Sequence, residues 1–267
     1  MKNIQNQNSW NAISRSYQKE KRISLSDVHY GPAAPGEKEL GLLGDVRGKK
    51  ILELGCGGGQ NSIVLAKWGA EVKGLDISNV QLEHAKKLAE KEGVQVEFIQ
   101  GKMEELDGLA GNSFDIVISS HAIGYADDLK SVFSETARVL KTKGFLVFCF
   151  GHPMWLTIGT ALEDNDLKEI RSYFDRNRDT WDWHCIDGIK ATFNQGNWTL
   201  TEIINGLGVE GLQITRIEEP QAYAAAEIET KAPYSSHAIH LDREKYLNFV
   251  RVIRTIPFSL IVKARKI

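Results

Sequence analysis

The chain has 267 residues, of which 42% are hydrophobic and 25% are charged, and its formal net charge is -2. This length and composition fit one large globular domain, or one domain with a lid. A nearly neutral chain without a long run of Lys and Arg argues against holding nucleic acid or anionic lipid by charge alone. We therefore expect a partner that is neither a nucleic acid nor a membrane.

The N-terminal stretch is polar and lacks an apolar signal core, and no segment approaches the roughly 18 apolar residues of a membrane span. The three cysteines, Cys56, Cys149 and Cys185, show no CxxC spacing. Neither a disulfide framework nor a zinc site is therefore indicated. Together these features favour a cytoplasmic protein without a bound metal.

Apolar runs alternate with helical patterns through the middle of the chain. Five runs are typical of buried strands, at residues 49–55, 71–76, 94–100, 114–120 and 145–150. Helical patterns lie between them, at residues 60–69, 78–93 and 128–144. Strands that are apolar throughout and are joined by helices predict a parallel sheet covered on both faces. The predicted fold class is a doubly wound α/β domain.

The pattern changes after residue 150. Residues 151–197 are rich in aromatic and charged side chains and show no clear strand alternation, so we expect an inserted lid there. Thr199 and Glu202 form a predicted capping box at the start of a further helix. Two more strands are expected at residues 212–220 and 258–266, with a helix around residues 243–253. The predicted divisions are a cover (1–47), a core (48–150), a lid (151–197) and a C-terminal part of the sheet (198–267).

A glycine cluster, "LELGCGGGQNS", follows the first predicted strand. Such a turn lets a ligand approach the backbone where no Cβ intervenes. The dinucleotide fingerprint fails here because Gln60 stands where its third glycine belongs, and no Gly-Lys-Ser/Thr follows to make a P-loop. A carboxylate at Glu53 repels a pyrophosphate and attracts an ammonium group. Asp76 ends the next predicted strand, where a carboxylate is placed to bind both hydroxyls of a ribose.

This pattern resembles the class I S-adenosylmethionine-dependent methyltransferases, whose first motif is an acidic residue followed by G-x-G-x-G. The resemblance is carried by "ILELGCGGGQNSIVLAKWGAEVKGLDIS" and extends over about residues 48–150. It implies a mostly parallel, seven-stranded Rossmann-like sheet and S-adenosylmethionine as cofactor. It also implies a role for each motif residue: Glu53 at the amino end of the cofactor, Gly55, Cys56, Gly57 and Gly59 along its methionine part, and Asp76 on its ribose.

Further motif positions extend the resemblance. Ile77 would pack on the adenine, while Lys102, with Met103 beside it, stands where the family commonly has an Asp that contacts the adenine amino group. "FDIVISSHAIGYADD" resembles the fourth motif and would place Ser119 and His121 at the edge of the cofactor. Because Lys cannot accept the adenine hydrogen bond, the backbone of Met103 or a neighbouring acid is left to do so.

The segments outside the core are expected to shape the acceptor site. Residues 1–47 look like the helical cover of small-molecule methyltransferases, with Tyr17 and Tyr30 as candidate walls. Candidate acceptor contacts are the aromatic residues Tyr125, Trp155 and Trp183, for which plain core packing is the alternative.

Methyl transfer needs a base only if the acceptor must lose a proton. His152, which follows the fifth predicted strand, is preferred for this role over His121. The sequence thus predicts methyl transfer to a small organic molecule by a monomer or homodimer, with the accepting atom (oxygen, nitrogen or carbon) left open. A non-catalytic binder that keeps the fold and an NAD-dependent oxidoreductase are the alternatives, and Gln60 disfavours the second.

Overall fold

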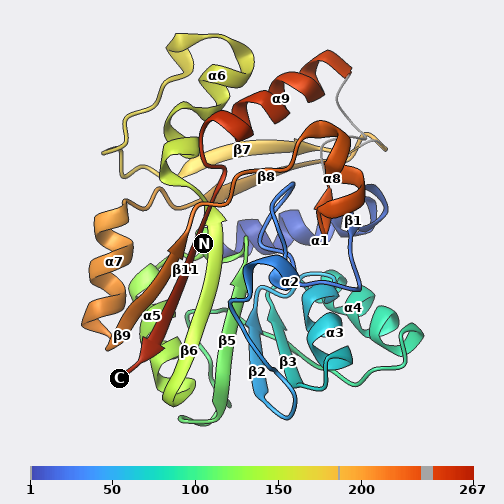
Figure 1. Ribbon diagram of the computed structural model, residues 1–267, viewed down its shortest axis with the longest axis vertical. Coiled ribbons are helices and arrows are strands. Elements are labelled where there is room, and N and C mark those ends of the chain that lie inside the picture. The colour runs from blue at the N-terminus through green and yellow to red at the C-terminus, as the bar shows by residue number, and fades with distance from the viewer. Residues whose placement is uncertain (1, 186, 236–242) are drawn as a thin grey trace.

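A single mixed sheet organises the described part of the chain, which comprises residues 2–185, 187–235 and 243–267 of this computed structural model. Within these residues its strands run in the order β4-β3-β2-β5-β6-β11-β9 (Figure 1). Their bounds are β2 Lys50–Leu54, β3 Glu71–Asp76, β4 Glu97–Gln100, β5 Phe114–Ser120, β6 Leu140–Gly151, β9 Leu212–Glu218 and β11 Ser259–Lys266. β11 is antiparallel to β6 and β9, and the other pairs are parallel. The predicted doubly wound, mostly parallel seven-stranded sheet is confirmed.

Among the helices predicted with bounds, α3, α4 and α9 begin and end within two residues of the predicted positions. Their bounds are α1 Lys2–Glu20, α2 Glu37–Leu40, α3 Gln60–Lys67, α4 Asn79–Lys91, α5 Leu129–Val139, α6 Thr160–Asp164, α7 Leu200–Val209, α8 Ala225–Lys231 and α9 Arg243–Thr255. The capping box at Thr199 and Glu202 is complete, which explains why α7 starts where it does. Among the described helices, none combines the length and the apolar composition that crossing a bilayer requires.

Both faces of the sheet are buried, as continuous apolar strands demand. Leu52 and Leu54 of β2 belong to an apolar cluster that includes Phe133 of α5. Ile51, the neighbour of Leu52, points the other way, into a second cluster that includes Val64 of α3. Since side chains alternate along a strand, each face of β2 meets its own layer of cover. The carboxyl ends of β2, β3, β5 and β6 then meet at one edge, where ligands of such sheets bind.

Two expectations about local structure were wrong. The helix predicted over residues 128–144 ends at Val139, and Leu140 already has extended backbone and pairs with Phe114 as the start of β6. The predicted lid, expected without strands, contains an antiparallel hairpin of β7 Asp179–His184 and β8 Lys190–Gln195. The missed signal is the alternation of Trp181 and Trp183 with polar neighbours, which is typical of a half-buried strand.

A layer of cover lies over the carboxyl edge of the sheet. In Figure 1, α1 lies beneath the β7–β8 hairpin, with α6 and α9 above it. Asn6 of α1 donates from Nδ2 to the carbonyl oxygen of Asn194 at 2.8 Å and accepts from the Asn194 amide at 3.0 Å. Ser9 donates to the carbonyl oxygen of Thr192 at 2.6 Å. The helix therefore satisfies backbone groups of a strand edge that would otherwise be unpaired.

Two small pairings complete the cover. β1 Arg22–Ile23 pairs with β10 Tyr234–Ser235, which brings the segment after α1 against the C-terminal part of the chain. Short turns occur at η1 Ile123–Tyr125 and η3 Leu167–Glu169, and a π-helical turn, η2, at Trp155–Gly159. Residues 236–242 of the predicted C-terminal part lie outside the described residues.

Candidate functional site

The glycine turn after β2 is shaped by close approach and by a hydrogen bond. Gly55 takes φ +69°, and a Cβ there would lie 2.1 Å from the Cβ of Ala122, just after β5. Gly57 takes φ +52° with open space where a Cβ would be, and its amide donates to Asp76 Oδ2 at 2.8 Å. Left-handed backbone at both positions favours glycine. Gly55 thus lets β2 and β5 come together at the edge, and Gly57 presents bare backbone.

Asp76 stands across the turn at the end of β3. Its second oxygen, Oδ1, accepts from the Ser78 amide at 2.8 Å, and the side chain is buried, with the residue 8% exposed. Burial raises the pKa of this carboxyl, although the amides of Ser78 and Gly57 act in the opposite direction. Each carboxylate oxygen accepts more than one hydrogen bond, so capacity for a ligand's hydroxyl groups remains.

Glu53 lies on β2 before the glycines and is 2% exposed. Its Oε2 accepts a hydrogen bond from the Ser62 hydroxyl on α3. Burial raises the pKa of Glu53 to about 8, and the nearby charge of Asp76 acts in the same direction. Two buried carboxyl groups at one edge disfavour each other's ionised forms and favour a cation between or beside them.

Both carboxyl groups open onto one cavity of about 530 Å³. The turn residues Gly55, Cys56 and Gly57 form its floor together with Glu53 and Asp76. The opposite walls come from the cover: Tyr17 from α1, Tyr125 from η1, Trp155 from η2 and Trp183 from β7. All of these were predicted as site residues, and the structure brings them together.

A smaller cavity of about 50 Å³ adjoins the first and shares Gly55, Asp76, Ala122, Trp10 and Tyr125 with it. The residues predicted to surround the adenine, Ile77, Lys102 and Met103, line this smaller space. The Lys102 ammonium lies 3.7 Å from Glu105. A neighbouring acid, Glu104, also lines the space, in keeping with the expectation that another group takes over from Lys102.

Three predicted cofactor contacts lie off the cavity wall. The Tyr30 hydroxyl donates to Glu37 at 2.7 Å within the buried core. Ser119 is 1% exposed, and its hydroxyl has no hydrogen-bond partner among the described residues. A Cβ on Gly59 would lie 2.8 Å from the Ala85 Cβ, so this glycine permits packing of α3 on α4. Strand alternation turns Ser119 inward, and the start of α3 turns Gly59 away from the ligand side.

The two candidate histidines have different surroundings. His121 lines the cavity with left-handed backbone (φ +53°), and its Nε2 lies 3.1 Å from the Ser259 hydroxyl. Burial lowers the pKa of His121 to about 4, so the ring is neutral near pH 7. His152 is absent from the wall: Nε2 lies 2.7 Å from Glu219, and Nδ1 accepts from the Met154 amide at 2.9 Å. Both of its ring nitrogens are therefore engaged, and the structure does not place His152 at the cavity where the preference for it as the base would require it.

Sequence reasoning missed His29, which also lines the cavity. Its Nδ1 lies 3.3 Å from the Ser120 hydroxyl, and burial lowers its pKa to about 3, with His121 acting in the same direction. Two residues on, Gly31 takes φ +120°, and a Cβ there would lie 2.3 Å from His121 Nε2. The "HYG" triplet thus packs against His121, although nothing in its spacing indicates a strand or helix.

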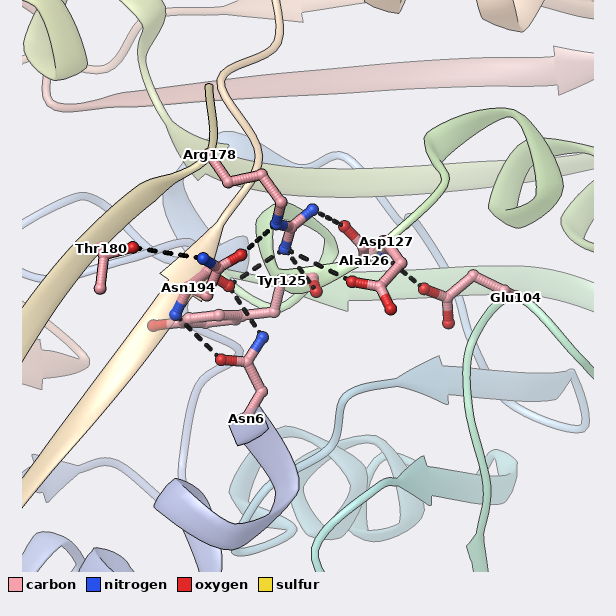
Figure 2. A network of polar contacts seen from close by, with 8 residues as sticks. All are labelled: Asn6, Glu104, Tyr125, Ala126, Asp127, Arg178, Thr180 and Asn194. Carbon is pink, nitrogen blue, oxygen red and sulfur yellow. Dashed lines mark hydrogen bonds and ion pairs between the residues drawn. The ribbon is translucent and has the colours of Figure 1, made fainter. Parts of the chain in front are cut away.

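The cover is fastened to the edge of the sheet by a network of polar contacts (Figure 2). Arg178, whose side chain is 10% exposed, donates to the carbonyl oxygens of Ala126 at 2.6 Å and Tyr125 at 3.2 Å. The same guanidinium donates to Asn194 of β8, at its side-chain oxygen and, at 3.0 Å, at its carbonyl. Figure 2 shows Asn6 of α1 meeting Asn194 from the other side. One planar donor group therefore joins three segments that are distant in sequence.

The core of the chain matches a known protein family. Residues 52–148 match the family described as "Methyltransferase domain". An uncharacterized methyltransferase of Bacillus subtilis, YbaJ, is 33% identical over 126 residues, which cover 47% of this chain and 49% of that protein. The match therefore spans about half the length of that relative. An uncharacterized protein of Haemophilus influenzae is 28% identical over 256 residues, 92% of this chain and 90% of that protein.

Solved structures extend the similarity to the whole fold. A crystal structure of an S-adenosylmethionine-dependent methyltransferase from Mesorhizobium loti superimposes with a TM-score of 0.61 at 21% identity. The superposition covers 88% of this chain and 98% of that one. The fold is thus shared over the core and most of the flanking segments, while the family match is confined to the core that holds the glycine turn.

Proposed function

Because this chain belongs to the class I S-adenosylmethionine-dependent methyltransferases, we propose that it transfers a methyl group from that cofactor to a small organic molecule. One observation carries the proposal: Glu53 and Asp76 face a single cavity across the glycine turn, and aromatic side chains of the cover close its other side. A donor site and a space for an acceptor therefore share one enclosure.

The residues of the turn fit the donor. Asp76 has hydrogen-bonding capacity left for the ribose hydroxyls, and Gly57 exposes backbone without a Cβ. Glu53, whose pKa is raised to about 8 by burial, gains a counter-charge from the ammonium group of an amino acid. Bound S-adenosylmethionine supplies a methyl group on a positively charged sulfur. The chain contributes alignment of the reactants and exclusion of water. In well-oriented intramolecular model reactions, alignment lowers the activation barrier by roughly 7 to 11 kcal/mol.

The cavity wall favours a small, partly apolar acceptor. Tyr17, Tyr125, Trp155 and Trp183 supply large rings, as small-molecule sites usually do. A nucleic-acid partner is disfavoured by the nearly neutral net charge, and an NAD-dependent oxidoreductase by Gln60 in place of the third glycine of the dinucleotide fingerprint. If the acceptor must lose a proton, His121 is the better placed of the two predicted histidines, since it lines the cavity and is neutral.

We further propose that the protein works in the cytoplasm as a monomer or homodimer. All three cysteines are free and buried, which fits a reducing compartment. Sedimentation equilibrium distinguishes the two assemblies.

The test is incubation with methyl-labelled S-adenosylmethionine and a panel of phenols, amines and carboxylic acids, with thermal unfolding followed in parallel. We expect the cofactor to raise the unfolding temperature and label to appear in at least one acceptor. Thermal protection without label in any acceptor would favour the non-catalytic binder. Protection by NAD but not by S-adenosylmethionine would contradict the proposal.

A further inference from the structure

Three aromatic rings from the second half of the chain form one part of the cavity wall. Trp155 meets Phe258 at 4.7 Å between ring centroids and Phe249 at 5.9 Å, both edge to face. Phe249 and Phe258 meet each other at 5.9 Å in the same manner. All three line the cavity. Rings that are locked together in this way present a rigid apolar wall.

A π-helical turn positions the tryptophan. Trp155 begins this turn, η2, and a Cβ on Gly159 would lie 2.5 Å from the Trp155 ring. Single π turns inside helices are frequent at functional sites. The chain then continues directly into α6, which carries Glu163 onto the same cavity. One short segment therefore delivers both an aromatic ring and a carboxyl group to the wall.

Glu163 has a carboxyl group that the protein does not neutralise within the described residues. Its side chain makes no ion pair or hydrogen bond there, although Asn248 donates to its backbone carbonyl oxygen. Burial raises the pKa of Glu163, and the neighbouring Asp164 acts in the same direction. A partly buried carboxylate without a partner is costly, and a cation beside it removes that cost.

The charged residues on the cavity wall also favour a cationic ligand near Glu163. Among the described residues that line the cavity, the acidic ones are Glu53, Asp76, Glu163 and Asp179, and the basic one is Arg171. Arg171 is already paired with Asp179. The first two acids belong to the donor side, so Glu163 is left as the uncompensated charge on the acceptor side.

We infer that the methyl acceptor carries an ammonium group, which Glu163 binds beside the aromatic wall of Trp155, Phe249 and Phe258. Rings next to a carboxylate recognise cationic amines, because the ring faces are negative and the carboxylate supplies the full counter-charge. This ammonium group holds the acceptor at Glu163 and is not itself assigned as the atom that receives the methyl group. The inference rests on the proposed function, which places the acceptor in this cavity.

The test is a binding measurement with three probes of similar shape: 2-phenylethylamine, which is cationic near pH 7, 2-phenylethanol and 3-phenylpropionate. Titration calorimetry is run with and without saturating S-adenosylhomocysteine. We expect the amine to bind most tightly and the carboxylate least. Glu163→Gln should lower the affinity for the amine about tenfold and leave the affinity for the alcohol unchanged.

A matched variant controls for charge and folding. Asp164→Asn removes one negative charge from the adjacent, exposed position of α6 and should not weaken any of the three probes, because Glu163 ionises more readily without its acidic neighbour. Trp155→Leu should weaken binding of the amine more than binding of the alcohol, because only the amine carries a charge that the ring face attracts. Equal loss of all probes in Glu163→Gln, or tightest binding of the carboxylate, would overturn the inference. Failure of the proposed function would be seen separately, as a lack of S-adenosylhomocysteine binding. The affinity order of the three probes would still be measured in the titrations without S-adenosylhomocysteine.

Discussion

The cavity has two sides that are built in different ways. On the donor side, Glu53, the glycine turn and Asp76 come from neighbouring strands of one sheet, and backbone amides hold the key carboxylate. On the acceptor side, α1, the β7–β8 hairpin, α6 and α9 come from distant parts of the chain. Asn6 joins α1 to the hairpin, and Asn248 joins α9 to α6. A continuous motif thus defines the donor, whereas contacts between remote segments define the acceptor.

Substitutions on the two sides should therefore affect different measured properties. A substitution on the donor side alters a pattern that serves one ligand group, so its effect should appear in cofactor affinity. A substitution in the fastening of the cover alters how several segments sit together, so its effect should appear in stability and in acceptor binding. The four predictions below probe this division.

Asp76→Ala should have the largest effect, on the donor side. Removing a carboxylate that accepts from the ligand's hydroxyl groups should weaken S-adenosylhomocysteine by about 100-fold, since hydrogen bonds to charged groups contribute about 1.5 to 3 kcal/mol each. Titration calorimetry measures the loss. Asp115→Ala is the control, because Asp115 lies at the amino-terminal end of β5, away from the glycine turn, and is paired with Lys141. Unchanged affinity in Asp76→Ala would remove the ribose assignment.

Arg178→Met should act on the cover. The carbonyl oxygens of Tyr125 and Ala126 lose a buried donor, so we expect the free energy of unfolding to fall by about 2 kcal/mol. The KM of the acceptor should rise more than the Kd of the cofactor. Arg176→Met is the matched control, since Arg176 is on the same loop and its pair with Glu202 is exposed. Equal changes in KM and Kd would mean that the two sides are not separable.

The donor side could be predicted from the sequence because its signals are local. Glu53, Gly55, Gly57 and Asp76 lie at fixed places relative to strands whose apolar runs are easy to recognise, and the structure puts them on one wall. The structure departs from the expected arrangement at residues whose packing is decided by a neighbour in space. Ser119 points into the core because of strand alternation, and Gly59 serves the packing of Ala85.

The acceptor side could be predicted only in part, because its signals depend on tertiary contacts. Tyr125, Trp155 and Trp183 were recognised by composition, but nothing local indicated that Glu163 would join them. His152 seemed suitable because it follows β6, yet Glu219, on a distant segment, occupies its ring nitrogen. A pairing between residues so far apart leaves no pattern in a single sequence.

A pair of histidine variants tests the boundary between the two sides. His121→Asn should slow methyl transfer at least about tenfold, because its ring forms part of the wall and is the better placed candidate base. His152→Asn should leave the rate within about twofold and lower only stability, since His152 lies off the cavity and bonds to Glu219. Single-turnover rates with saturating cofactor make the comparison. The reverse order of effects would restore His152 as the base.

Glu53 should produce the smallest effect, a pH dependence on the donor side. Its pKa is raised to about 8 by burial, so the free protein holds this carboxyl mostly protonated at pH 6 to 7. A cationic amino group stabilises the ionised form, so binding should release a proton, and affinity should rise severalfold between about pH 5.5 and 7.5.

Glu53→Gln tests this contribution, because the variant keeps Asp76 and removes only the ionisable group of Glu53. Affinity in the variant should vary less with pH than in the unmodified chain. Stability without ligand should move the opposite way: the folded state binds a proton that the unfolded state has lost, so the free energy of unfolding falls as pH rises from about 4.5 toward 8. Identical pH profiles for binding in the two proteins would show that Glu53 does not face the cofactor's charge, and the donor side would then rest on Asp76 and the glycine turn alone.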